Sequence, residues 1–182
     1  MNLFLMMLRA PRPSRISDMP AVSMPRWIRR GYDGLTFFGY IITPTKQEAD
    51  AFNRGTSEGH GASFTMKNHE MIHLYQARAT HNSWLCFYWK YFVFWLQASR
   101  YRKYLRNAGY LLNPFEIEAY EHMREADYLA LHPEGCTGWK VYAAMPLSER
   151  LVFAVNALHL HAELTRQDSI QHDTHKGSQC QP

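Results

Sequence analysis

The sequence feature that most constrains the fold is an H-E-x-x-H pattern from His69 to His73, within the run from Thr65 to Thr80. If this run is a helix, both histidines leave the same face about one turn apart, which suits a tetrahedral zinc ion. Glu70 then lies beside the metal but outside its ligand pair. From there it can take a proton from zinc-bound water. The pattern therefore predicts a zinc site in which Glu70 is the general base.

Length and composition predict a single domain. The chain has 182 residues, of which 46% are hydrophobic and 14% aromatic. It is long enough to bury one core and too short for two full domains. We expect this domain at residues 25–165, after a leader at 1–24 that lacks fixed structure or precedes the true start. Residues 166–182 are polar and predict a disordered tail.

Cysteines and charge limit the possible partners. Cys86, Cys136 and Cys180 form no close pair, so we expect neither a disulfide framework nor a cysteine zinc site, and a reducing, cytoplasmic location. The net charge is +4, with basic residues gathered at 9–15, 26–30 and 100–106. No zinc-finger or glycine-rich element accompanies these stretches, so no nucleic-acid partner is expected. The positive charge could favour binding to an anionic membrane surface, or it could serve only to keep the protein soluble.

The rest of the chain predicts mainly helices with a small β element. Leu35 to Thr43 is rich in aromatic and β-branched residues and ends before Pro44, as a short strand does. Lys46 to Arg54 predicts a brief helix, and Gly55 to Gly61 predicts a loop. A last helix is expected to begin near Ser148.

The segment from Trp84 to Leu96 is almost wholly apolar and aromatic. Its 13 residues, which include Lys90, are too few to cross a bilayer. We favour a helix that is mainly core and packs across the motif helix. An interfacial helix, with aromatic rings at headgroup depth and the basic residues 100–106 on lipid phosphates, stays open as an alternative.

A second helix begins at Asn113, where Asn is a good N-cap and Pro114 suits the first helical position. It is expected to run to about Leu131, because Pro133 disfavours helix at the residue before it. Glu116 stands three residues after Asn113, the spacing of a capping box.

The predicted zinc site needs a third protein ligand. The extended pattern H-E-x-x-H-x-x-G-x-x-H fails, because Gln76 and Ala79 occupy its last two defined positions. We expect Glu116 on the second helix to complete the set, since it shares a narrow apolar face with Ala119. Glu118 should point the opposite way, toward the charged residues that follow. A simple capping role for Glu116 is the alternative.

Together, the blocks from His69 to Gln76 and from Asn113 to Tyr120 resemble small bacterial zincin-like proteins of the gluzincin type, most of them of unknown function. That family pairs an H-E-x-x-H helix with a Glu on a second helix, often within Glu-x-x-Ala, which Glu116 and Ala119 match. Many gluzincins carry an Asp four residues after this Glu, where the present chain has Tyr120.

The resemblance implies a minimal zincin-like architecture, with the H-E-x-x-H helix packed against the Glu-bearing helix. It also implies a zinc metallopeptidase that acts on a peptide or protein substrate. Zn²⁺ would be held by His69, His73 and Glu116, with Glu70 as base and Tyr120 steadying a ligand or an oxyanion. The alternative function is a zinc-stabilised binding protein without turnover, with peripheral membrane contact.

Overall fold

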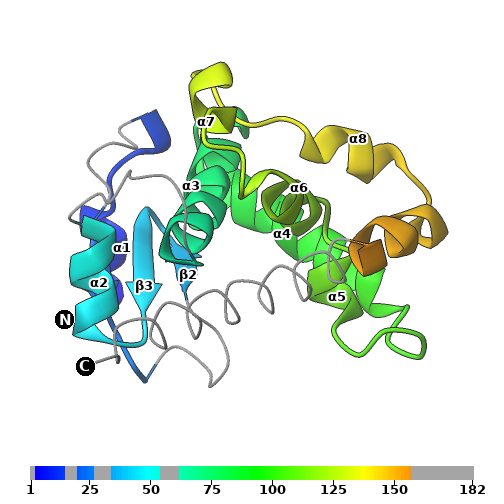
Figure 1. The fold of residues 1–182 in the computed structure, drawn as a ribbon, viewed down its shortest axis with the longest axis horizontal. Coiled ribbons are helices and arrows are strands. Elements are labelled where there is room, and N and C mark those ends of the chain that lie inside the picture. The colour runs from blue at the N-terminus through cyan, green and yellow to red at the C-terminus, as the bar shows by residue number, and fades with distance from the viewer. Residues whose placement is uncertain (1–2, 15–19, 27–33, 54–61, 157–182) are drawn as a thin grey trace, which may run out of the picture.

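The computed structural model describes residues 3–14, 20–26, 34–53 and 62–156. Within these ranges the chain is mainly helical with one three-stranded sheet, as the composition of its segments predicted (Figure 1). The strands are β1 (Ala21–Ser23), β2 (Leu35–Phe37) and β3 (Tyr40–Thr43). The helices are α1 (Leu3–Arg9), α2 (Lys46–Asn53), α3 (Ala62–Ala79), α4 (Trp84–Ser99), α5 (Ala108–Leu111), α6 (Pro114–His122), α7 (Tyr128–Leu131) and α8 (Trp139–Ala144). The chain is also helical over residues 147–156.

The sheet has the order β1-β3-β2, with β3 parallel to β1 and antiparallel to β2. The single strand predicted for Leu35 to Thr43 is wrong, because the segment folds back on itself as a hairpin. Phe38 and Gly39 form the turn, and both have positive φ angles, 43° and 82°. Positive φ angles at both turn residues are typical of two-residue hairpin turns, because they match the twist of the two strands. The glycine adopts such an angle without strain.

The prediction that residues 1–24 form an unstructured leader is wrong for the described part of that range. β1 pairs with β3, with Ala21 opposite Ile41. It therefore forms the hydrogen bonds along one edge of β3, the central strand of the sheet. Met6 on α1 is 1% exposed and packs with Ile42 on β3. The apolar residues of this segment are thus part of the domain. The predicted loop at Gly55 to Gly61 and the predicted tail at 166–182 lie outside the described residues.

α3, which carries the H-E-x-x-H pattern, is the central element of the fold. It contacts α2 and β2 on one side and α4, α6 and α7 on the other, as Figure 1 shows. The side chains that it buries against its neighbours include Ile72, Leu74 and Ala77, each 0% exposed. The core that surrounds it is largely aromatic and includes Phe87, Phe115 and Trp139.

α6 begins where the sequence predicted and ends earlier. Asn113 is its N-cap, and its side chain accepts a hydrogen bond from the Phe115 amide. The helix stops at His122 rather than near Leu131, and α7 follows as a separate turn. Asn68 on α3 explains the early end, since its side-chain amide donates to the carbonyls of His122, Met123 and Glu125. These carbonyls are satisfied across the interface instead of within a longer helix.

α4 has two different faces, so the prediction that Trp84 to Leu96 is mainly core is wrong for half of the helix. Trp84 and Phe87 are buried, at 9% and 2% exposed. Trp89 and Phe92 are 67% and 49% exposed. No helix in the described ranges combines the length and apolar character needed to cross a bilayer.

Candidate metal centre

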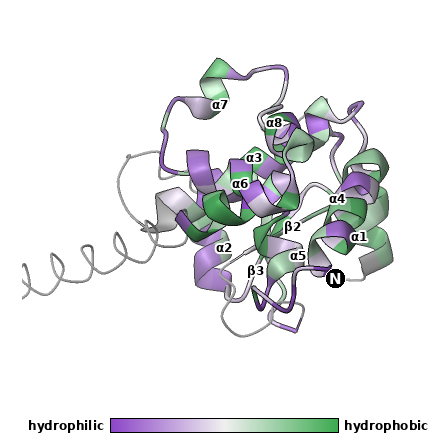
Figure 2. Ribbon diagram, turned by 90° about the vertical axis from the view of Figure 1, so that its right-hand side faces the viewer, coloured by the Kyte–Doolittle hydropathy of each residue, from purple (hydrophilic) through white to green (hydrophobic). Residues whose placement is uncertain are grey.

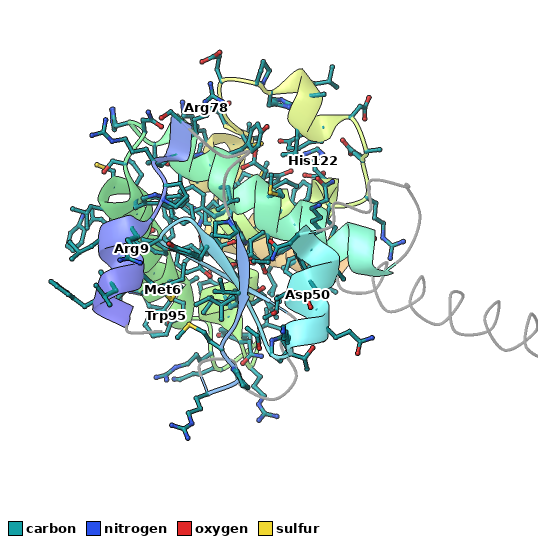
Figure 3. The ribbon with its side chains drawn as sticks, turned by 90° about the vertical axis from the view of Figure 1, so that its left-hand side faces the viewer. Met6, Arg9, Asp50, Arg78, Trp95 and His122 are labelled. Carbon is teal, nitrogen blue, oxygen red and sulfur yellow. The ribbon has the colours of Figure 1, made fainter. Side chains whose placement is uncertain are left out.

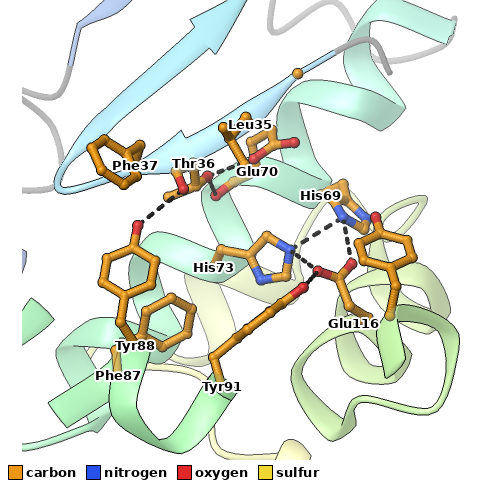
Figure 4. Close-up of a pocket in the computed structure, with 12 residues that line it drawn as sticks. Leu35, Thr36, Phe37, His69, Glu70, His73, Phe87, Tyr88, Tyr91 and Glu116 are labelled. Carbon is orange, nitrogen blue, oxygen red and sulfur yellow. Dashed lines mark hydrogen bonds and ion pairs between the residues drawn. The ribbon is translucent and has the colours of Figure 1, made fainter. Parts of the chain in front are cut away.

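His69 and His73 extend from one face of α3 toward the same point, as the four-residue spacing predicted. Both residues are almost completely buried, at 2% and 6% exposed. The two Nε2 atoms are 3.2 Å apart, and the rings stand nearly perpendicular, at 88° (Figure 4). Both imidazoles therefore present the same nitrogen to one small volume.

Glu116 reaches this volume from α6. Its Oε2 lies 3.4 Å from His69 Nε2, and its Oε1 lies 3.5 Å from His73 Nε2. The backbone amide of Asn113, which a capping box would bond to this carboxylate, donates to the Tyr110 carbonyl instead. The structure thus places Glu116 beside the histidines and not in the capping role.

The three side chains fit a tetrahedral zinc ion. Ligand distances of about 2.0–2.1 Å and a tetrahedral angle imply about 3.3 Å between neighbouring ligand atoms. The closest approaches among His69, His73 and Glu116 are 3.2, 3.4 and 3.5 Å. These residues also form a buried group whose ligand atoms all lie within 4.8 Å of one another. Two imidazoles and a carboxylate are a common donor set for zinc that keeps one position open.

The charges of the three groups are strongly coupled. Burial lowers the pKa of His73, but the Glu116 carboxylate outweighs burial and, with help from Glu70 and Gln76, raises the pKa to about 9. Burial also raises the pKa of Glu116, yet His73 and His69 outweigh it and hold that pKa well below its usual range. Without a metal, the site therefore keeps a proton on His73 and a negative charge on Glu116.

A buried hydrogen-bond chain orients His73 from behind. Gln76 Oε1 lies 2.8 Å from His73 Nδ1, and Gln76 Nε2 donates to Glu118 Oε2 at 2.7 Å and to the Phe115 carbonyl at 2.9 Å. Because the amide oxygen accepts, Nδ1 carries a proton in both charge states of the ring, and the neutral ring has its free lone pair on Nε2, on the Glu116 side. The chain thus selects the tautomer that a metal ligand requires.

Glu118 was predicted to face the charged residues at the end of the helix, and this prediction is wrong. Its side chain is 0% exposed, and Oε1 accepts hydrogen bonds from the Tyr128 hydroxyl at 2.8 Å and the Gly138 amide at 2.6 Å. The early end of α6 brings α7 and the following turn over this face, so the carboxylate is enclosed rather than solvated. Its position behind Gln76 makes it part of the support for His73.

Tyrosines surround the carboxylate of Glu116. The Tyr91 hydroxyl on α4 donates to Glu116 Oε1 at 2.7 Å. Tyr120, a candidate from the sequence, packs its ring edge-on against His69 with 4.6 Å between ring centroids. Its hydroxyl lies 3.1 Å from that of Tyr110, whose side chain lines the cavity beside the histidines. Tyr120 therefore supports the His69 ring, and Tyr110 stands between it and the cavity.

Glu70 lies on the opposite side of the site, against β2. Thr36 donates its hydroxyl to Glu70 Oε2 at 2.5 Å, which fixes the carboxylate beside the cavity (Figure 4). A Cβ atom at Gly34 would lie 3.1 Å from Glu70 Oε1, so the glycine leaves space at the second oxygen. The cavity has a volume of about 260 Å³, and its lining includes His69, Glu70, His73 and Glu116.

The outer edge of β2 is partly covered at this cavity. The Tyr88 hydroxyl donates to the Thr36 carbonyl at 2.9 Å and accepts from the Phe38 amide at 3.0 Å. One tyrosine thus makes the two hydrogen bonds that a neighbouring strand would make. Burial, the largest influence, raises the pKa of Tyr88, so its hydroxyl keeps its proton at neutral pH.

Sequence reasoning missed Gln76, Glu118, Tyr91 and Thr36 as parts of the site. Gln76 carries a local signal, because it follows His73 by three residues and must share its side of a helix. Tyr91 and Thr36 carry none, since 25 and 34 residues separate them from the glutamates that they contact.

Comparisons with known protein families, with curated proteins and with solved structures find no match for this chain.

Proposed function

We propose that the chain is a zinc-dependent metallopeptidase of zincin-like, gluzincin architecture. The observation that supports this most is the convergence of His69, His73 and Glu116 to within 3.2 to 3.5 Å of one another. Glu70 stands beside them on the same cavity without contributing to that cluster. The packing of α3 against both β2 and α6 agrees with the proposed architecture.

His69, His73 and Glu116 would hold the ion. Bound there, zinc would polarise a carbonyl and lower the pKa of a water molecule at its open position. Gln76 keeps His73 in the tautomer that leaves Nε2 free to bind. Tyr91 holds the Glu116 carboxylate in place through its hydroxyl.

Glu70 is the general base and then the general acid. Its carboxylate accepts a proton at the oxygen that faces the cavity and returns that proton to the leaving amine of the peptide. The hydrogen bond from Thr36 prevents the carboxylate from rotating away during this exchange. Removal of the base should slow hydrolysis by about 10² to 10⁴, the usual contribution of a positioned acid or base.

The cavity walls indicate the type of peptide. Five of the twelve lining residues are Phe or Tyr side chains from β2, α4 and α5, namely Phe37, Phe87, Tyr88, Tyr91 and Tyr110. Such walls favour an apolar or aromatic side chain next to the cleaved bond. We therefore infer a peptide substrate with a large apolar residue at that position.

The test combines metal analysis with a peptide-library cleavage assay. Wild type and Glu70→Gln should each bind one zinc per chain, and only wild type should cleave. Glu149→Gln is the matched control, because Glu149 is exposed and away from the cavity. His73→Ala and Glu116→Gln should lose zinc affinity by orders of magnitude. Stoichiometric zinc in His73→Ala would contradict the assignment of the site.

A zinc-stabilised binding protein is the second candidate function. The aromatic cavity supports it, because the same walls could bind an apolar ligand without any reaction. It predicts full zinc occupancy with no cleavage by wild type. It also predicts that Glu70→Gln leaves ligand binding unchanged, whereas the peptidase proposal predicts loss of turnover.

A further inference from the structure

α4 presents a row of large apolar side chains to solvent, on the face away from the cavity. Its members are separated by four, three and four residues, so they lie on one side of the helix. They are 73%, 67%, 49% and 48% exposed, in the order Leu85, Trp89, Phe92 and Leu96. The Trp95 ring, 42% exposed, stacks on Phe92 and widens the row.

α1 also carries exposed apolar side chains, and the chain just after it contacts the start of α4, where Trp84 Nε1 donates to the Pro11 carbonyl at 3.0 Å. Phe4 and Leu8 are 65% and 66% exposed, and Leu5 and Met7 are 43% and 40% exposed. Figure 2 shows α1 and α4 together on its right-hand side, with much of α4 in the hydrophobic colour. Figure 3, from the opposite direction, shows α1 together with Trp95 on its left-hand side. We call these two exposed rows the α1/α4 face.

Positive charge borders this face, and negative charge is absent from the sequence around it. Residues 71–115, which include all of α4, contain no Asp or Glu and six basic residues, namely Arg78, Lys90, Arg100, Arg102, Lys103 and Arg106. The last four of these follow the exposed row directly and are exposed themselves. Beside α1, Arg9 and Arg12 are also exposed.

We propose that the α1/α4 face docks on an anionic lipid surface. Aromatic side chains are stable at the depth of the headgroups, where an apolar ring meets a wet boundary, and nearby Lys and Arg side chains pair with phosphates. The helices of the face are too short to span a bilayer, so the protein would lie on the surface. A second copy of the chain is a poorer occupant, because two basic borders would repel each other.

Docking through α4 would place the cavity of the metal centre close to the lipid, because the inner side of α4 forms part of the cavity wall. Phe87, Tyr88 and Tyr91 on α4 line the cavity of the metal centre. A helix with its side chains is about 10–12 Å across, so docking would hold the cavity about one helix diameter from the lipid. The docking itself does not depend on hydrolysis, and its test uses no activity readout.

The experiment measures sedimentation of the 182-residue, zinc-loaded chain with vesicles. Wild type should bind phosphatidylcholine vesicles that contain phosphatidylglycerol, and this binding should weaken as salt is raised. Pure phosphatidylcholine should retain much less protein. Arg102→Gln/Arg106→Gln should weaken binding by about 30-fold, which corresponds to about 1 kcal/mol per basic residue near an anionic surface.

Trp89→Ser/Phe92→Ser tests the apolar part and should weaken binding by at least about tenfold. Leu131→Ser and Val141→Ser are matched controls, because they change residues that are 68% and 59% exposed on α7 and α8. Both controls should bind vesicles like wild type. Zinc content and circular dichroism of every variant should match wild type, which shows that the fold is retained.

Three results would overturn the proposal. The first is wild-type protein that does not sediment with the anionic vesicles, and the second is a Trp89→Ser/Phe92→Ser variant that binds as well as wild type. The third is a dimer in light scattering that the same variant abolishes while vesicle binding is absent, which would assign the face to a second copy of the chain.

Discussion

At the scale of single residues, the metal centre depends on side chains that never touch the ion. Gln76 is 0% exposed and links His73 to Glu118 and to the Phe115 carbonyl. Each of its polar atoms has a partner, so the amide can neither flip nor leave without breaking these three hydrogen bonds. The orientation of His73 is therefore set by α6 as much as by α3.

Gln76→Met should weaken zinc binding by about 10 to 100-fold, the usual effect of losing a partner that orients a metal-ligating histidine. The methionine fills a similar volume but accepts no hydrogen bond from His73, and it removes the donor to Glu118 Oε2. Gln47→Met is the control, since Gln47 is exposed on α2. A competitive zinc titration measures both, and equal affinities for wild type and Gln76→Met would show that the amide does not orient the ligand.

Zinc binding at pH 7 should release about one proton per site. With its pKa raised to about 9, His73 is protonated at pH 7 in the metal-free protein, whereas a zinc ligand must be neutral. Titration calorimetry in two buffers of different ionisation enthalpy measures this proton. The release should fall toward zero as the pH passes about 9. No release at pH 7 would mean that His73 is already neutral.

The same pKa shifts fix how stability of the metal-free protein depends on pH. The contribution of His73 is complete below its ordinary value of 6.5 and is lost as the pH rises through about 9. Glu116 contributes above its ordinary value of 4.5, and that contribution is lost as the pH falls, because its pKa is lowered. Chemical denaturation of the metal-free protein should therefore give the highest stability between about pH 4.5 and 6.5.

At the scale of elements, the turn after α7 depends on a glycine that packs against the end of α3. Gly135 has a φ of +122°, and a Cβ there would lie 2.7 Å from the Ala79 amide and the Tyr75 carbonyl, both in the backbone of α3. The next residue, Cys136, donates its amide to that same carbonyl at 3.2 Å. No side chain can move aside at this contact.

Gly135→Ala should lower the free energy of unfolding by about 2–4 kcal/mol, because it combines an unfavourable backbone conformation with overpacking. Glu134→Ala is the control, since the Glu134 side chain is 91% exposed and should matter little. Urea denaturation measures both. If the two variants have the same midpoint as wild type, the turn does not pack on α3 as described.

At the scale of the whole molecule, the centre joins two helices that are distant in sequence. His69 and His73 come from α3, and Glu116 comes from α6, after 42 intervening residues. α3 also contacts the sheet, so an ion at this point would tie both halves of the fold together. A ligand that binds only the folded state stabilises it in proportion to the logarithm of its concentration.

Chelation of zinc should lower the melting temperature by about 10 °C. Free zinc at about 1,000 times its dissociation constant contributes about 4.1 kcal/mol, and each kcal/mol shifts a protein of this size by about 2–4 °C. Calorimetry with and without chelator measures the shift. His69→Ala should show no shift on chelation, and a shift equal to that of wild type would place the stabilising ion elsewhere.

The sequence by itself determined the local parts of this protein. The four-residue spacing of His69 and His73 places them on one face of any helix. Asn113 followed by Pro114 is a favourable helix start, and α6 begins there. A mainly helical fold with a small β element followed from the same kind of short-range pattern. Glu116 was singled out by its place on the apolar face of its helix.

Only the tertiary structure decided which groups surround these residues. Glu118 is enclosed because α6 ends early, at His122, where Asn68 of α3 bonds its last carbonyls. This contact spans 54 or more residues, so no local pattern contains it. Tyr91 and Thr36 likewise reach the site from distant segments. α4 is apolar on nearly every side, so its sequence cannot indicate which side the rest of the chain covers. Phe87 is buried and Trp89 is exposed, because burial depends on neighbouring elements that are distant in sequence.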